Sequence, residues 1–306
     1  MTFRAFPHIG QLRHLCKTLN HDEALHPTEL MTYRGTVKLH GTNAAVLQSA
    51  PGESILMQSR NRLIDKSCDN FGFATFVEQR AEVFMKIFQK IRDTTQAEGS
   101  IHMFGEFAGQ GVQKNVAVSM IPKFYCIFAV ALDGSYQDLR RFGGLGEPLH
   151  RIHDVLDFGI WSLELHRGQP EQSLAEVEAI TSQVASICPV GLYFGIEGPG
   201  EGMVWQCLTA LSETSLWFKS KHQDFMVSPA KLTTLTGSSK YEAETFAKAV
   251  MTKQRLKQAK NECTALGIDA STWAVEDVLR EEADFIKCSD AEMLQEVLIK
   301  QAEKFL

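Results

Sequence analysis

The sequence contains no closely spaced cysteine pair of the C-x-x-C type. Its seven cysteines are scattered singly along the 306 residues, at Cys16, Cys68, Cys126, Cys188, Cys207, Cys263 and Cys288. Isolated cysteines are typical of proteins from a reducing compartment, where thiols pack in the core as small apolar groups. The cysteine pattern therefore predicts no zinc site.

Long apolar runs are also missing. The longest, Phe124 to Leu132, is far shorter than the roughly 20 residues that a membrane-spanning helix needs. The first ten residues contain no apolar stretch of the kind found in signal peptides. We therefore expect a cytoplasmic protein without a membrane segment.

The chain has no excess of positive charge and no phosphate-binding loop of a standard type. Its net charge of -6 argues against a uniformly basic nucleic-acid binder, although net charge hides local patches. The glycine-rich bend at 142–146 lacks both the G-x-G-x-x-G spacing and the G-K-[ST] ending. With 44% hydrophobic and 22% charged residues, and no internal repeat, the chain is an ordinary globular protein, long enough for one large domain and one small one.

Periodicity predicts a mixed first part and a helical second part. Residues 3–15 form a lead-in, and apolar residues at three- and four-residue steps predict a long amphipathic helix from Phe73 to Ile91. A capping box of Ser173 and Glu176 predicts a helix to about Ile187. Strands are expected on both sides of residues 38–43 and at residues 54–60, 101–107, 124–132, 202–208 and 215–218.

Beyond Pro229 only helices are expected. They run from Tyr241 to Leu266, from about Trp273 to Ile286, and from a capping box of Ser289 and Glu292 to the end. The prediction is an α+β fold: a domain of antiparallel sheets and helices over residues 1–228, then a small all-helical C-terminal domain over residues 229–306.

The stretch Lys38-Leu39-His40-Gly41-Thr42-Asn43 lies between two apolar, β-branched pieces and reads as strand, tight turn, strand. Gly41 supplies the free backbone that a tight turn needs and allows a ligand to approach the main chain. A lysine at such a turn can project its amine into a cleft, where burial and nearby positive charge would make it a nucleophile. The alternative, a surface turn with a solvated lysine, is the commoner meaning of an isolated K-x-x-G.

Three further stretches place charged residues at strand ends. Glu106 follows Phe104-Gly105, Glu201 begins Glu-Gly-Met-Val, and Lys219 and Lys221 stand two residues apart, on the same face of a strand. Each has a simpler explanation when taken alone: the carboxylates could face water, and the lysines could discourage edge-to-edge pairing of strands.

Taken together and in this order, these stretches resemble motifs I, III, IV and V of the covalent nucleotidyltransferases, which include DNA ligases, RNA ligases and messenger-RNA capping enzymes. With histidine at position 40, the stretch Lys38–Asn43 is similar to motif I of the RNA ligase 2 family, because DNA ligases and capping enzymes have aspartate there. The loop from Phe104 to Gln113 is also similar to that family, Arg60 falls at its motif Ia, and Phe128 falls at motif IIIa. The resemblance covers residues 3 to 228 and implies an ATP-grasp-like nucleotidyltransferase domain.

The resemblance implies an RNA ligase that uses ATP and Mg2+ to join an RNA 3′-hydroxyl to a 5′-phosphate through a lysyl-AMP and an RNA-adenylate. Lys38 would be the nucleophile, with Lys219 and Lys221 neutralising the α-phosphate and disfavouring a protonated Lys38. Glu201 would hold the metal, and Glu106 would contact the ribose or a metal-bound water. His40 and Arg60 would orient phosphates in the later steps. The nucleotide site would comprise Lys38, Asn43, Arg60, Glu106, Phe128, Lys219 and Lys221.

Two positions depart from the family pattern. Val37 replaces the frequent glutamate, so any adenine contact there must come from the main chain, and Ala129 replaces the usual aspartate of motif IIIa. Phe128 could still stack on a purine. We expect a monomer that acts on RNA, with a nicked duplex as the expected substrate.

The alternatives are a DNA ligase or capping-type enzyme, which would need a β-rich domain after motif V, a non-catalytic RNA-binding descendant of the fold, and an unrelated α+β domain. From Lys219 to Lys260 the chain has nine basic and three acidic residues, a net +6, and Lys253, Lys257 and Lys260 share one helix face. That face is either simply solvated or follows RNA phosphates.

Overall fold

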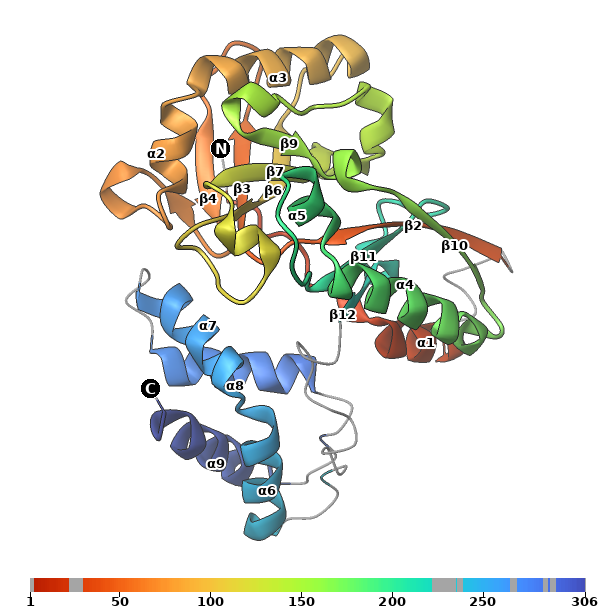
Figure 1. Cartoon of the computed structure of the whole chain (residues 1–306), viewed down its shortest axis with the longest axis vertical. Helices are drawn as coiled ribbons and strands as arrows, with labels where there is room; N and C mark the ends of the chain where they lie inside the picture. The colour runs from red at the N-terminus through yellow and green to blue at the C-terminus, as the bar shows by residue number, and fades with distance from the viewer. Residues whose placement is uncertain are drawn as a thin grey trace. The chain divides into compact units, whose positions relative to one another are not determined.

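The structure is a computed structural model that describes residues 3–21, 30–221, 235, 239–264, 269–282, 286 and 290–305 (Figure 1). The chain divides into two compact units, Met1–His222 and Gln223–Leu306. The domain boundary expected at residue 228 lies outside the described residues. In the part of the chain that is described, no helix is long and apolar enough to cross a membrane.

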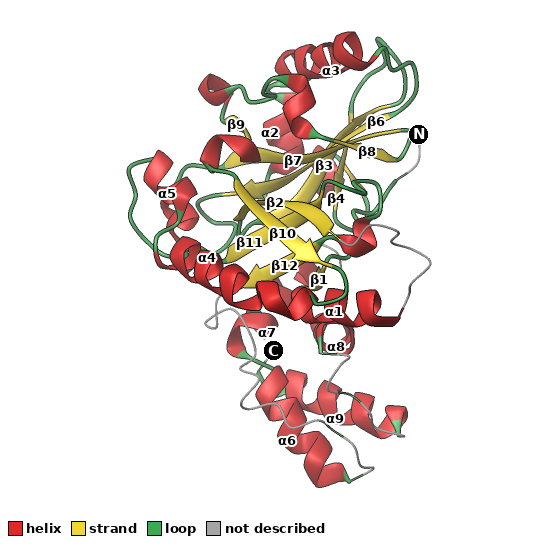
Figure 2. Cartoon of the chain, turned by 90° about the vertical axis from the view of Figure 1, so that its right-hand side faces the viewer, coloured by secondary structure: helices red, strands yellow, loops and turns green. Residues whose placement is uncertain are grey.

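The first unit contains a smaller, mostly antiparallel sheet. Its strand order is β1-β12-β11-β2-β10, with bounds Gly10–Gln11, Phe218–Lys221, Gly202–Cys207, Leu30–Lys38 and Trp161–His166. Only β1 and β12 pair in parallel. The helix α4 (Leu174–Ser186) packs against β11 and β12, and α1 (Leu12–His21) packs against β12 (Figure 2).

The larger sheet of this unit has the order β5-β4-β3-β6-β7-β8, with β9 pairing in parallel with β7. The bounds in that order are Leu63–Ile64, Leu56–Ser59, Thr42–Gln48, Ile101–Ala108, Phe124–Leu132, Ser135–Gln137 and, for β9, Ile152–Asp154. Strands β3, β6 and β7 are almost fully buried, as their apolar and β-branched sequences predict.

The helix expected from Phe73 to Ile91 is two helices, α2 (Phe73–Glu78) and α3 (Ala81–Thr95). Arg80 leaves the helical conformation, and its guanidinium donates to the carbonyls of Phe76 and His150. The break lets both helices bury their aromatic residues. Phe73 of α2 packs on Phe107, and Phe84 of α3 packs on Tyr125, so one aromatic layer covers this face of the sheet.

Two local expectations are wrong. Ser173 does not cap α4, because a 3-10 helix, Pro170–Ser173, precedes it and the Ser173 hydroxyl donates to the Glu164 carbonyl. The expected strand at residues 215–218 begins only at Phe218, since Thr214–Leu216 form a 3-10 helix. The remaining helices of the unit are α5 (Pro189–Tyr193) and 3-10 turns at Lys66–Cys68, Ala117–Met120, Leu139–Phe142, Pro148–His150 and Val155–Phe158.

The second unit is helical where it is described, apart from a single bridge between Leu235 and Ile286. Its helices are α6 (Lys240–Val250), α7 (Lys253–Thr264), α8 (Ala270–Glu281) and α9 (Ala291–Glu303). The helix expected over 241–266 is therefore broken at Met251–Thr252. Side chains of Asp269 and Asp290 cap α8 and α9. The expected cap at Ser289 lies outside the described residues.

The helices of this unit enclose their own apolar core. In the same unit, Arg255 is bound to Asp277 at 2.8 Å and to Glu282 at 3.1 Å. Arg255 is one of the nine basic residues between Lys219 and Lys260, but its charge is neutralised inside the unit. Lys253, Lys257 and Lys260 are all exposed, as their spacing predicts.

Candidate active site

Lys38 is the last residue of β2, in the smaller sheet, and Thr42 is the first residue of β3, in the larger sheet. The three residues between them carry the chain from one sheet to the other. A Cβ atom on Gly41 would lie 2.4 Å from the carbonyl oxygen of Phe107, so only glycine fits this crossing. The expected strand, turn and strand are present, and they join two sheets rather than form a hairpin.

Glu201 gathers three of the predicted residues. Lys38 Nζ donates to Glu201 Oε2 at 2.7 Å, Lys221 Nζ lies 3.0 Å from Oε1, and His40 Nδ1 lies 3.3 Å from Oε2. The carboxylate is 3% exposed, whereas the two lysines are about a fifth exposed, at 21% and 23%. Burial alone would raise the pKa of Glu201, but Lys38 and Lys221 outweigh it and hold that pKa well below its ordinary value.

The register of the smaller sheet explains how these residues meet. Gly202 lies opposite both Lys38 and Lys221, so the three neighbouring strands β2, β11 and β12 bring the lysines to Glu201, the residue just before β11. Lys219 lies two residues before Lys221 and shares its face of the strand. Ser220 points to the other face, where its hydroxyl contacts Thr181 of α4 at 2.6 Å.

Glu106, on β6, binds the crossing itself. Its Oε1 accepts a hydrogen bond of 2.9 Å from the main-chain N–H of Gly41. Burial raises the pKa of Glu106 to about 7; Lys38 and Arg60 lower it and the neighbouring Glu201 raises it further. Two carboxylates of one site therefore have pKa values pushed in opposite directions, an arrangement typical of catalytic sites.

Two residues that sequence reasoning did not single out also hold this crossing. Gln113 Nε2 donates to the Gly41 carbonyl at 3.2 Å, and Asn70 Nδ2 donates to the Thr42 hydroxyl at 3.1 Å. Both side chains are buried. Gln113 stands in the loop that carries the family resemblance, which was a usable signal, whereas nothing in the sequence around Asn70 indicates the contact.

The other predicted residues lie on strands of the larger sheet or directly after one. Asn43 pairs with Glu106 across β3 and β6, and its Oδ1 is buried with no hydrogen-bond partner among the described residues. Arg60 follows β4 and is close enough for its charge to lower the pKa of Glu106. Phe128, on β7, is half-buried and packs edge-to-face on Phe6 of the lead-in at 5.0 Å.

The two departures from the family pattern are both buried. Val37 is 2% exposed and faces away from Lys38, as neighbouring residues of a strand do. Ala129 is 3% exposed and pairs with Phe104. Neither side chain supplies a polar group.

The donor set at this site suits magnesium. Among the residues described, no group of three or more His, Cys, Asp or Glu side chains could hold a metal ion. Mg2+ does not require such a cage, because it usually binds one or two carboxylates, substrate phosphates and water. Glu201, buried and anionic, with Glu106 beside it, provides oxygen ligands of that kind.

A lysine at a sheet crossing, a buried carboxylate and a second lysine two strands away form a site typical of the covalent nucleotidyltransferases. The family model for RNA ligase matches residues 31–221, well over half of the chain. The chain belongs to the RNA ligase family, and the resemblance of its motifs to those of RNA ligases is thereby confirmed.

Comparison with solved structures supports the same fold. An RNA ligase from Naegleria gruberi with pyrophosphate matches with a TM-score of 0.50 and 14% identity, over 75% of this chain and 59% of that one. An arginine-to-alanine mutant of the same ligase, with ATP and Mn, gives the same values. This chain thus spans about three fifths of the ligases it matches. No curated protein sequence matches it significantly.

Proposed function

We propose that the protein is an ATP-dependent RNA ligase that joins RNA 3′-hydroxyl and 5′-phosphate ends. The observation that carries the proposal is the cluster of Lys38, Glu201 and Lys221. In it a candidate nucleophile and a phosphate-neutralising cation each lie within 3.0 Å of the same buried carboxylate, at 2.7 Å and 3.0 Å. Membership of the RNA ligase family and the ATP and pyrophosphate complexes of the N. gruberi ligase support it.

In the first step, the neutral amine of Lys38 attacks the α-phosphorus of ATP, a P–N bond forms and pyrophosphate leaves. Because Lys38 Nζ donates to Glu201, the amine must turn from the carboxylate to the phosphate before it attacks. Lys219 and Lys221 then neutralise charge on the α-phosphate, which is the main requirement of nucleotidyl transfer.

In the second step, an oxygen of the RNA 5′-phosphate attacks the lysyl-AMP, so that the P–N bond breaks and an RNA-adenylate forms. In the third, the RNA 3′-hydroxyl attacks that 5′-phosphate, seals the strand and releases AMP. His40, bound to Glu201, and Arg60, beside Glu106, are placed to orient phosphates in these steps.

Glu201 and Glu106 would hold magnesium, which supplies charge neutralisation at phosphate oxygens when bound. The unpartnered Oδ1 of Asn43 and the half-buried ring of Phe128 would contact the nucleoside, the ring by stacking on adenine. The substrate we expect is a nicked duplex bound by a monomer. Five of the six described cysteines are buried, as is typical of thiols in proteins from a reducing compartment, and this supports a cytoplasmic location.

The other candidates are less well supported. A DNA ligase or capping-type enzyme would carry a β-rich domain after Lys221, but the described residues of the second unit are almost all helical. A non-catalytic RNA-binding descendant would be expected to have lost Lys38, Glu201 or the lysines of β12, and all are present.

The test is covalent labelling. Incubation with labelled ATP and magnesium should give a covalent AMP adduct on the peptide that contains Lys38, and the adduct should survive alkali but be cleaved by acid, as a P–N bond is. Lys38→Ala and Lys38→Arg should both fail, since a guanidinium stays protonated, whereas Lys114→Arg, at an exposed lysine outside the cluster, should label normally. An adduct on another lysine would refute the assignment. RNA-adenylate and sealed product, followed on nicked and single-stranded RNA, would then define the substrate.

A further inference from the structure

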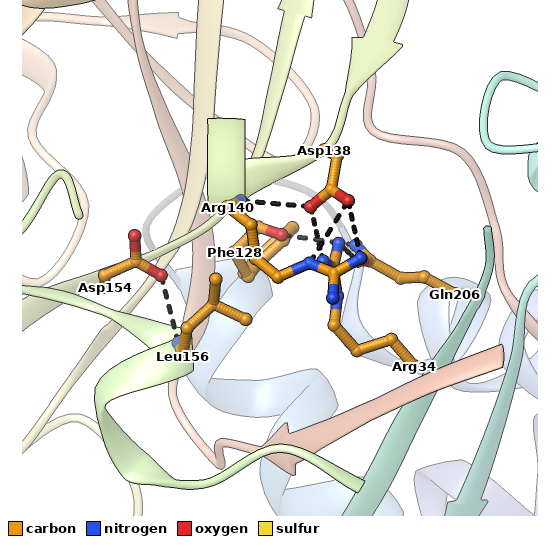
Figure 3. Close-up of polar contacts among 7 residues, drawn as sticks. All are labelled: Arg34, Phe128, Asp138, Arg140, Asp154, Leu156 and Gln206. Atoms are coloured by element: carbon orange, nitrogen blue, oxygen red, sulfur yellow. Dashed lines mark hydrogen bonds and ion pairs between the residues drawn. The ribbon is translucent and has the colours of Figure 1, made fainter. Parts of the chain in front are cut away.

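A buried polar network joins the two sheets of the first unit at a distance from Glu201. Arg34, on β2, lies opposite Gln206 on β11, and its Nη2 donates to Gln206 Oε1 at 3.1 Å. Its Nη1 is bound to Asp138, which follows β8 and also binds Arg140. Figure 3 shows Arg34 and Gln206 converging below Asp138, with the Phe128 carbonyl reached from Gln206.

The chemistry of the neighbours fixes which way the Gln206 amide points. A guanidinium has only donors, so Arg34 must face the amide oxygen. The amide nitrogen is then left for an acceptor, and Gln206 Nε2 donates to the Phe128 carbonyl at 3.3 Å. Arg34 and Gln206 are 2% and 5% exposed, so the hydrogen bond between them is shielded from water.

Phe128 is the extra residue of a β-bulge. Phe104 pairs with Ala129 and Gly105 pairs with Ile127, so that Phe128 has no opposite residue on β6. A bulge interrupts the regular ladder and re-aims the side chain that it carries. The main chain at Phe128 is thus held by a side chain of the other sheet where the regular register with β6 is broken.

We infer that Gln206 is a positioning residue for nucleotide selection. Oriented by Arg34 and Asp138, it fixes the bulge and thereby the plane in which the Phe128 ring meets the base. The inference rests on the proposed function, in which that ring stacks on adenine. Because Val37 and Ala129 supply no polar group, selection of a purine then depends on this stacking surface, which is set from the opposite sheet.

The test uses Gln206→Glu. The carboxylate still accepts from Arg34 but can no longer donate, and it repels the Phe128 carbonyl. Adduct formation should show a KM for ATP about fivefold higher, the effect of one lost hydrogen bond, with kcat little changed. The preference for ATP over CTP should fall by a similar factor. In the Phe128→Ala background the same substitution should have no further effect on KM, since the ring that it positions is gone.

Thermal unfolding of each variant separates this role from general destabilisation, and Gln206→Met, which also lacks the donor, replaces Gln206→Glu if that variant does not fold. The inference is overturned if Gln206→Glu leaves the preference for ATP over CTP unchanged. It is also overturned if the substitution raises the KM for ATP equally with and without the Phe128 ring. Absence of any adduct with the unaltered protein overturns the proposed function instead.

Discussion

Glu201 is the residue on which the site depends most, because it is buried and is the counter-charge of two lysines. Glu201→Gln keeps the size of the side chain but removes the negative charge that Lys38 and Lys221 share. We expect adduct formation to fall by two orders of magnitude or more, on the scale of roughly 3 kcal/mol for lost electrostatic stabilisation.

The measurement is single-turnover labelling with ATP across a magnesium titration. Glu197→Gln, at an exposed glutamate four residues earlier, is the matched control and should behave normally. Near-normal labelling by Glu201→Gln at every magnesium concentration would show that groups other than Glu201 hold the metal and position Lys38.

Glu106 makes stability depend on pH with a definite sign. Its pKa is about 7 in the folded protein and about 4.5 otherwise. Between these values the unfolded chain has released this proton and the folded one has kept it, so the free energy of unfolding falls as pH rises through that window. The amide of Glu106→Gln can still accept from Gly41 but does not titrate. In this variant the fall in the free energy of unfolding, up to roughly 3 kcal/mol across the window, should disappear.

Denaturant titrations of both proteins at pH 5, 6, 7 and 8 would measure the difference. Glu53→Gln, at an exposed position, serves as the control for loss of one carboxylate. A gap between the wild type and Glu106→Gln that stays constant from pH 5 to 8 would contradict the raised pKa.

At the scale of elements, the sequence was most informative where one strand carries a strong local pattern. The run from Phe124 to Leu132 predicts β7 to the residue, and the two-residue spacing of Lys219 and Lys221 predicts their common face. These are short-range properties of a strand. Glu106 and Glu201 could be identified only because their motifs resemble a family.

The remaining features depend on contacts between distant segments. At the break between α2 and α3, Arg80 donates to the His150 carbonyl, 70 residues away. Asn70 reaches Thr42 from a loop, and the bulge at Phe128 depends on its pairing with β6. Local periodicity contains none of this information. The broken helix, the contact of Asn70 with Thr42 and the bulge are therefore seen only in the structure.

The crossing between β2 and β3 gives the prediction that belongs to this scale. Gly41→Ala would place a Cβ atom 2.4 Å from the Phe107 carbonyl and 3.0 Å from the Glu106 side chain. The backbone must shift, which costs about 1–3 kcal/mol in a packed site and moves Lys38 away from Glu201. We expect a lower melting temperature and adduct formation reduced at least about tenfold, since small displacements of a nucleophile have large effects.

Gly168→Ala is the matched control, because a Cβ atom at Gly168 would meet nothing within 4 Å. Both variants would be followed by thermal unfolding and by labelling with ATP. Normal labelling by Gly41→Ala would mean that the crossing is more adaptable than its packing indicates.

At the scale of the whole molecule, the two units differ in how they use charge. The first unit buries the carboxylate of Glu201 between two lysines of the site. The second neutralises Arg255 internally and leaves the lysine row of α7, Lys253, Lys257 and Lys260, exposed. Lys231, which contributes to the expected basic stretch, lies outside the described residues. A row of exposed lysines suits RNA phosphates because it binds the backbone without reading sequence.

Replacing Lys253, Lys257 and Lys260 together by glutamine therefore tests whether this row carries RNA. Each phosphate contact contributes close to one to the slope of log affinity against log salt, so the slope should decrease by up to about three and RNA binding should weaken most at low salt. Adduct formation with ATP should be unchanged, because Lys38 and its partners all lie in the first unit. The control removes three other exposed lysines, Lys86, Lys300 and Lys304, and so changes the net charge equally. If both triple variants lose the same affinity and the same slope, the effect is one of overall charge and the α7 row is only a solvated helix face.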